Sequence, residues 1–195
     1  AQGQWATPLL TLSQLHISTP DASLLGQLSY HTLSQAVQGQ LALTLPGANG
    51  QFEGDLASTS GQGTLAIQVT DAAQATRWLS RVPVVGKVVP ADQFKGAAEL
   101  TTSWQGGWQS QGRSMKIQAT LRAPEMDWTG NPGADAAIPV AWHLSQLQAD
   151  LSGTLADMQL RTQGQAKTGE RQMDWQAQLS GWQRDVDHWQ GILNQ

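Results

Sequence analysis

The chain has 195 residues, a formal net charge of −4 and no cysteine. The lack of cysteine excludes a disulfide framework and thiolate metal sites. The 11 Lys and Arg residues are scattered, so the basic stripe that nucleic acid requires is absent and nucleic acid is not expected as a partner. Only 39% of the residues are hydrophobic and 13% charged, which is low for a soluble domain and indicates a neutral polar surface.

The first predicted strand covers residues 9–18. Its apolar positions change parity between Leu12 and Leu15, which predicts a β-bulge near Ser13 and Gln14.

Four strands and a turn are expected over the next fifty residues. Residues 24–45 carry enough alternating apolar positions for two strands. Residues 46–50 are predicted to form a turn, because proline presets φ and Asn-Gly tolerates a positive φ. Strands are expected at 51–58 and 63–70.

A short helix is predicted over 71–80. Helix-forming residues follow a plausible N-cap at Thr70 or Asp71, and Trp78 and Leu79 are expected on its buried side. The apolar stretch 82–90 contains two prolines, so it is predicted to be an extended connector and not a central strand.

Strand patterns resume after this connector. Alternation from Phe94 to Trp104 predicts one strand, 113–123 predicts another, and the Pro- and Gly-containing segment 124–137 predicts a loop. Further strands are expected at 138–145, 146–155, 157–166 and 172–181. The spacing of apolar residues over 185–194 favours a second short helix.

Each predicted strand has one apolar and one polar face, because successive side chains point to opposite sides. Two short helices cannot cover the apolar side of about ten strands, and glycines interleaved with the large apolar residues permit strong bending. The predicted fold is therefore mainly β: a long curved antiparallel sheet rolled into an apolar groove (β-taco-like), with two short helices. The predicted groove-lining residues are Leu41, Leu43, Leu45, Phe52, Leu56, Leu65, Ile67, Val69, Phe94, Leu100, Met115, Ile117, Leu121, Leu151, Leu155, Met158, Leu160, Trp175 and Leu179.

We expect residues 1–195 to form a single β-groove segment of a larger protein. A weak internal similarity, with several strands followed by a helix containing Trp78 or Trp189, suggests two repeat units over about 1–82 and 83–195. Chance similarity within a low-complexity sequence is the alternative explanation.

Catalytic motifs are weak throughout the chain. The four histidines lack metal-ligand spacing. Gly61-Gln62-Gly63 precedes a predicted strand, whereas the glycine motif of a dinucleotide site must be followed by a helix. No enzymatic activity, cofactor or metal is predicted. The tryptophans at strand ends allow three interpretations: caps of the core, stacking platforms for sugars, or the lining of an apolar conduit. They are Trp104, Trp108, Trp128, Trp142, Trp175 and Trp182.

Two segments carry a resemblance to a known family. Residues 77–108, with Arg-Trp-Leu-Ser-Arg-Val-Pro near the start and Gln-Gly-Gly-Trp at the end, resemble TamB, the translocation and assembly module subunit of proteobacterial envelopes. Residues 150–160 (Asp-Leu-Ser-Gly-Thr-Leu-Ala-Asp-Met-Gln-Leu) do so too, and the recurring cadence is typical of the wider AsmA-like superfamily.

The resemblance implies a periplasmic protein that is anchored in the inner membrane and not enzymatic. Its groove would carry phospholipid between inner and outer membranes, or assist outer-membrane protein assembly with a TamA-like partner of the full-length protein. The competing hypothesis is a secreted β-sandwich or β-solenoid that binds glycans or protein partners.

Overall fold

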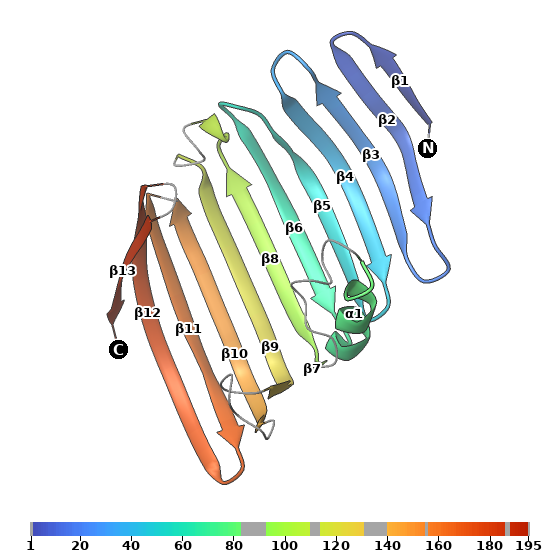
Figure 1. The fold of residues 1–195 in the computed structure, drawn as a ribbon. Helices are drawn as coiled ribbons and strands as arrows, with labels where there is room; N and C mark the ends of the chain where they lie inside the picture. Colours follow the sequence, from blue (N-terminus) through green and yellow to red (C-terminus); the bar gives the residue numbers. More distant parts are fainter. Residues whose placement is uncertain are drawn as a thin grey trace.

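A computed structural model describes residues 2–82, 93–109, 114–130, 140–154, 156–185 and 188–194. The described strands form one antiparallel, open sheet of 13 strands (Figure 1). Twelve strands lie side by side in sequence order, and β7 pairs with β9 off this path. The strands are β1 (Gln2–Ala6), β2 (Leu9–Ser18), β3 (Ser23–His31), β4 (Ala36–Leu45), β5 (Ala48–Leu56), β6 (Gly61–Val69), β7 (Phe94–Gly96), β8 (Ala98–Gln105), β9 (Lys116–Gly130), β10 (Val140–Thr154), β11 (Asp157–Thr168), β12 (Arg171–Asp185) and β13 (His188–Asn194).

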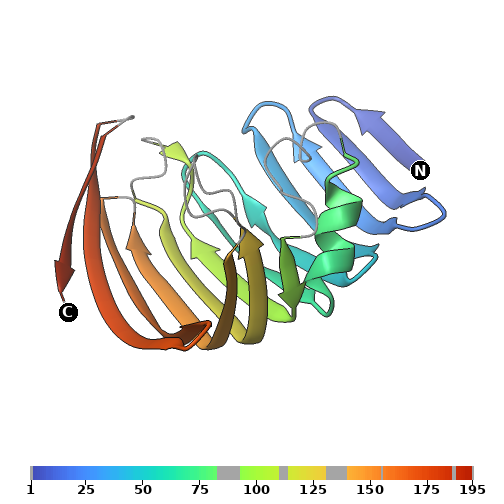
Figure 2. The same cartoon turned by 60° about the horizontal axis from the view of Figure 1, so that its bottom comes forward.

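This architecture confirms the mainly β fold class and the antiparallel sheet. It does not contain a second sheet in the described part of the chain, so the two-layer sandwich is not the arrangement that these strands adopt. Figure 2 shows that the sheet is curved, with its first and last strands rising on the same side.

The bulge predicted in β2 is present. The pairing of β2 with β3 shifts register between Leu12 and Leu15. The predicted turn at 46–50 is shorter than expected: β4 ends at Leu45 and β5 begins at Ala48. Asn49 pairs with Thr44 and with Gln68 inside the sheet, because the alternation of β5 extends back to the Pro46-Gly47 turn.

Helix α1 (Ala72–Leu79) forms where the sequence predicts it, with Asp71 as its N-cap. Its buried residues are Ala72 and Ala75, whereas Trp78 and Leu79, the predicted buried pair, are only partly covered. Small side chains allow the helix backbone to approach the sheet closely. The helix lies on the side toward which the sheet curves (Figures 1 and 2). Residues 83–90 of the predicted connector lie outside the described residues.

The strand predicted from Phe94 to Trp104 is divided into β7 and β8. Strand β8 pairs with β6 and with the first half of β9, while β7 pairs with the second half of β9. The prediction that a loop begins at residue 124 was therefore wrong, because β9 continues to Gly130. Pro124 falls between the positions paired with β8 and those paired with β7, where its missing N–H breaks no continuous ladder. Residues 131–137 of the expected loop lie outside the described residues.

Strand β10 is continuous across the two predicted strands 138–145 and 146–155. Gln146 has a positive φ of 54°, and the pairing with β11 shifts register between Ser145 and Gln148. One extra residue is therefore accommodated as a bulge, and the apolar positions of β10 change parity there. In the sequence alone, this change of parity predicts a break between two strands, because a bulge and a strand end give the same pattern.

The prediction of a second helix over 185–194 was wrong. Strand β12 runs to Asp185, and β13 pairs antiparallel with it, for example through Leu179 and Leu193. A helix-like spacing over a few residues is weak evidence for a helix. The edge of β12 offers unpaired backbone N–H and C=O groups, and pairing with them outweighs this local preference.

The buried core is small. Among the described residues, the buried apolar ones are Leu45, Ala72, Ala75, Ala123 and Ala166, and no large side chain is fully buried. The accessible surface is 12922 Å², whereas a compact globular protein of 20.9 kDa exposes about 9,000 Å². The excess arises because one layer of strands exposes both of its faces.

Candidate functional site: the apolar face of the sheet

Apolar residues form rows that cross the sheet perpendicular to the strands. In the longest of these, each residue is the direct cross-strand partner of the next, so the side chains share one face. This central row, whose only polar side chain is Thr102, consists of Leu15, Gly26, Leu41, Phe52, Leu65, Thr102, Ala119, Leu151, Leu160 and Leu179. It extends from β2 to β12.

Neighbouring rows on the same face contain most of the other predicted lining residues. One row includes Leu43, Ile67, Leu100 and Leu121, with Gly50 of β5 between Leu43 and Ile67. A shorter row joins Leu45, Ala48, Val69 and Ala98 at the ends of β4, β5, β6 and β8. On the other side of the central row, Trp104 pairs with Ile117, which is followed by Gly153 and Met158.

The remaining predicted residues lie toward the ends of strands. Leu56 pairs with Val37 and Gly61, Phe94 pairs with Trp128, and Trp175 pairs with Gly164. Met115 immediately precedes β9 and is partly exposed. Leu155 lies outside the described residues.

Most residues of the apolar face remain partly exposed. Leu41, Phe52, Leu65 and Ile67 are of intermediate exposure. Leu43 and Leu179 are 37% and 36% exposed. These values follow from the single layer, because same-face neighbours cover each side chain from the sides while nothing described covers it from above.

Trp104 and Trp175, two tryptophans on the apolar face, lie over glycines of the neighbouring strand. The Trp104 ring stacks on Phe52 with centroids 5.5 Å apart, and its Nε1 donates a hydrogen bond to the Asp55 carbonyl oxygen at 3.2 Å. A Cβ built on Gly54 would lie 2.8 Å from Cζ2 of Trp104. Trp175 relates to Gly164 in the same way, at 2.6 Å. These glycines are therefore required by ring packing as well as by curvature.

Several apolar-face residues were missed as lining residues by the sequence analysis. Leu24 pairs with Leu43, and Val37 lies between Tyr30 and Leu56, so both belong to the same face. Their alternation was visible, but it was used only to predict strands. Met126 and Trp128 were missed because the segment containing them was predicted to be a loop.

The opposite face of the sheet is polar, and one of its carboxylates, that of Asp150, accepts two hydrogen bonds from neighbouring side chains. The donors are the Thr120 hydroxyl, at 2.8 Å, and Nε2 of Gln148, at 2.7 Å. The Thr120 hydrogen bond, followed by that of Gln148 and the charges of Arg122 and Arg161, holds the pKa of Asp150 below its usual value. Asp127 and His143 form a second, exposed pair, with 2.8 Å between Oδ1 and Nδ1.

Neither face shows a metal site within the described ranges, where no cluster of three or more His, Asp or Glu side chains has suitable geometry. No helix in the described part of the chain is long and apolar enough to cross a membrane. Comparisons with family models, with curated proteins and with solved structures give no match.

Proposed function

We propose that this chain is a segment of a periplasmic envelope-spanning protein whose apolar sheet face carries phospholipid acyl chains between the inner and outer membranes, or assists outer-membrane protein assembly. The observation that supports the proposal best is the central row, an almost purely apolar path across the sheet that no described layer covers. A sheet with one apolar face must bury it against something. In this proposal the lipid is that layer.

We further propose that the apolar face is the concave one and forms the groove. Helix α1 lies on the concave side (Figure 2). The start of the helix is beside Leu45, a buried member of the apolar face, because the Gly47 carbonyl oxygen in the adjoining turn accepts hydrogen bonds from the backbone N–H groups of Thr70 and Asp71 at 2.9 and 3.0 Å. Curvature toward the apolar side also brings side chains on both flanks nearer to a bound chain.

The energetics favour extraction of an acyl chain from water. Each buried CH₂ group contributes roughly 0.8 kcal/mol, so a chain of typical length gains on the order of 10 kcal/mol before ordering costs are subtracted. Successive rows consist mainly of Leu, Ile, Val, Ala and Gly, so neighbouring positions along the groove are chemically alike. A uniform wall of this kind holds a chain without fixing it at one point, which suits transport.

The cellular setting of the proposal comes from the resemblance of residues 77–108 and 150–160 to the TamB family. On that basis the full-length protein is anchored in the inner membrane, resides in the periplasm and works with a TamA-like outer-membrane partner. No catalytic step is part of this function.

The test is site-specific photocrosslinking to lipid. A photoreactive amino acid replaces Leu41, Ile117 or Leu151, and the purified chain is incubated with vesicles that contain radiolabelled phosphatidylethanolamine and phosphatidylglycerol. Matched controls carry the same group at Gln40, Gln118 or Ser152. These controls are adjacent in sequence, point to the opposite face and are more exposed than the test positions.

We expect labelled phospholipid at the three apolar-face positions and little at the three controls. Because the controls are the more accessible set, simple collision with vesicles would label them at least as strongly. Equal capture on both faces, or no capture at either, would refute the proposal.

A further inference from the structure

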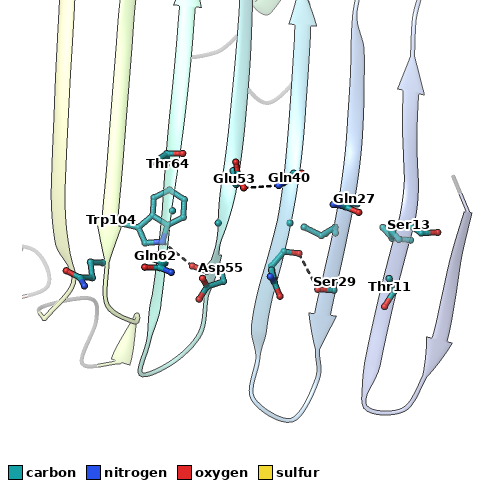
Figure 3. A pocket seen from close by; sticks show the side chains of 17 residues that line it. Thr11, Ser13, Gln27, Ser29, Gln40, Glu53, Asp55, Gln62, Thr64 and Trp104 are labelled. Atoms are coloured by element: carbon teal, nitrogen blue, oxygen red, sulfur yellow. Dashed lines mark hydrogen bonds between the residues drawn. The ribbon is translucent and has the colours of Figure 1, made fainter.

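The polar face of the sheet contains an elongated furrow that the proposed lipid function does not use. It is a depression of about 810 Å³ lined by residues from β2, β3, β4, β5, β6 and β8 (Figure 3). Its walls are two rows of polar side chains on neighbouring strands. One row contains Gln27, Gln40, Glu53 and Thr64, and the other contains Ser29, Gln38, Asp55 and Gln62.

The floor of the furrow is backbone. Between the two polar rows lie Gly39, Gly54 and Gly63, which are direct cross-strand partners. On the opposite face Trp104 of β8 reaches across β6 and lies against Gly54 and Gly63 (Figure 3). The floor is therefore a line of glycine backbone that runs across the strands, and the Trp104 ring, stacked on Phe52, packs against its other side.

The chemistry of the walls selects a neutral, hydroxyl-rich ligand. Amides both donate and accept hydrogen bonds, hydroxyls do the same, and carboxylates accept them. The furrow contains the carboxylates of Glu53 and Asp55 and no Lys or Arg, and residues 1–76 contain no Lys or Arg at all. Anionic ligands are therefore disfavoured, and an apolar ligand would leave these groups without partners.

Part of this surface is already oriented. Nε2 of Gln40 donates a hydrogen bond to Oε1 of Glu53 at 2.8 Å. This contact fixes both side chains and leaves Oε1 of Gln40 and Oε2 of Glu53 to accept hydrogen bonds from a ligand. Ordering before binding lowers the entropic cost of forming an interface.

The dimensions suit a linear polymer. The furrow crosses the strands at right angles, so its polar groups recur at the strand spacing of about 4.7–4.9 Å. One pyranose ring of an extended glycan is about as long as one such spacing. Successive strands then present an amide, hydroxyl or carboxylate group to successive sugar rings.

We propose that this furrow binds a linear, neutral polysaccharide. The site is on the face opposite the proposed lipid-carrying surface, so this proposal does not depend on the proposed lipid function. The one aromatic residue among those that line the furrow is Trp104, and its ring lies against the glycines on the opposite face of the sheet. Hydrogen bonds from the polar walls therefore carry the recognition, and the affinity depends on several sugars being engaged together.

The test is affinity electrophoresis of the full chain in native gels cast with soluble polysaccharides. Hydroxyethylcellulose, laminarin and dextran are the neutral probes, and carboxymethylcellulose and alginate are the anionic ones. The furrow variant is Gln40→Ala/Gln62→Ala. The matched control, Gln118→Ala/Gln159→Ala, removes two exposed glutamines from the same face outside the furrow.

We expect at least one neutral polysaccharide to retard the wild-type chain and the control variant equally. The furrow variant should bind with an apparent Kd about tenfold weaker, and urea unfolding checks that both variants remain folded. Retardation by none of the neutral probes, equal retardation of the furrow variant, or stronger retardation by the anionic probes would overturn the proposal.

Discussion

Substitution of Gly63 tests whether ring packing, and not only curvature, dictates the glycines of this sheet. A Cβ at position 63 would overlap Cζ2 of Trp104 and lie 2.7 Å from the Glu53 carbonyl oxygen. In Gly63→Ala the Trp104 ring must move away. It then loses its stacking on Phe52, which is worth about 0.5–1.5 kcal/mol, and its hydrogen bond to Asp55, worth about 0.5–1.5 kcal/mol.

The expected loss in free energy of unfolding is therefore about 1–3 kcal/mol. With an m-value of about 2 kcal/mol/M, a loss of 2 kcal/mol lowers the urea midpoint by about 1 M. Tryptophan fluorescence follows the transition. Gly50→Ala is the matched control, because a Cβ there meets nothing closer than 3.8 Å. The control should be neutral, or stabilising by up to about 1 kcal/mol.

A double variant separates the ring from the backbone contact. Adding Trp104→Ala to Gly63→Ala removes the obstructing ring, so the two substitutions together should cost less than the sum of their separate effects. If Gly63→Ala is as stable as Gly50→Ala, or if the two effects simply add, the packing argument is wrong.

Three further predictions concern the cap, the core and a turn. The hydrogen bond from the Gln74 backbone N–H to the Asp71 carboxylate, 3.0 Å long, is the main cause that lowers the pKa of Asp71. The stability contributed by the ionised cap is present above the carboxyl's unfolded pKa and is lost as pH falls through the lower folded pKa. The urea midpoints of wild type and Asp71→Ala should therefore converge on acidification, and a difference that does not change with pH would contradict this. Ala123 is 1% exposed, so Ala123→Leu should destabilise by about 1–3 kcal/mol, whereas the exposed Ala42→Leu should change stability little; equal urea midpoints for the two would refute the packing assignment. Gly169 has a φ of 58° with free space around it, so Gly169→Ala should cost about 1–2 kcal/mol from backbone conformation alone, and Gly169→Asn less; the ranking is read from thermal unfolding and fails if Ala is tolerated as well as Asn.

Local patterns predicted the strands and the helix wherever a single rule applied. The alternation from Leu41 to Leu45 and from Leu65 to Val69, the parity change at Leu12 and Leu15, and the Asp71 cap each depend on neighbouring residues alone. The apolar rows were accessible for the same reason. Once strands pair in order, residues of one parity necessarily share a face.

The errors occurred where pairing with distant strands decided the outcome. Pro124 looked like the start of a loop, yet β9 continues through it because its partner changes there from β8 to β7. The bulge at Gln146 resembled a strand break, although β11 keeps the two halves of β10 in one ladder. Residues 188–194 had a helical spacing but complete the ladder on β12.

The polar furrow was the feature furthest from sequence reasoning. Gln40 and Gln62 are 22 positions apart and belong to no local motif. They line one depression only because β4, β5 and β6 pair in a register that aligns Gly39, Gly54 and Gly63.

The sequence by itself determined that this protein is a sheet with one apolar and one polar side, because side-chain alternation is a property of each strand taken alone. The tertiary structure decided that all described strands join one open layer, that the apolar rows cross this layer from strand to strand and that no second described sheet covers them. Those features depend on register and on the number of layers. Both are set by the backbone hydrogen bonds between strands, which the order of residues along one strand does not encode.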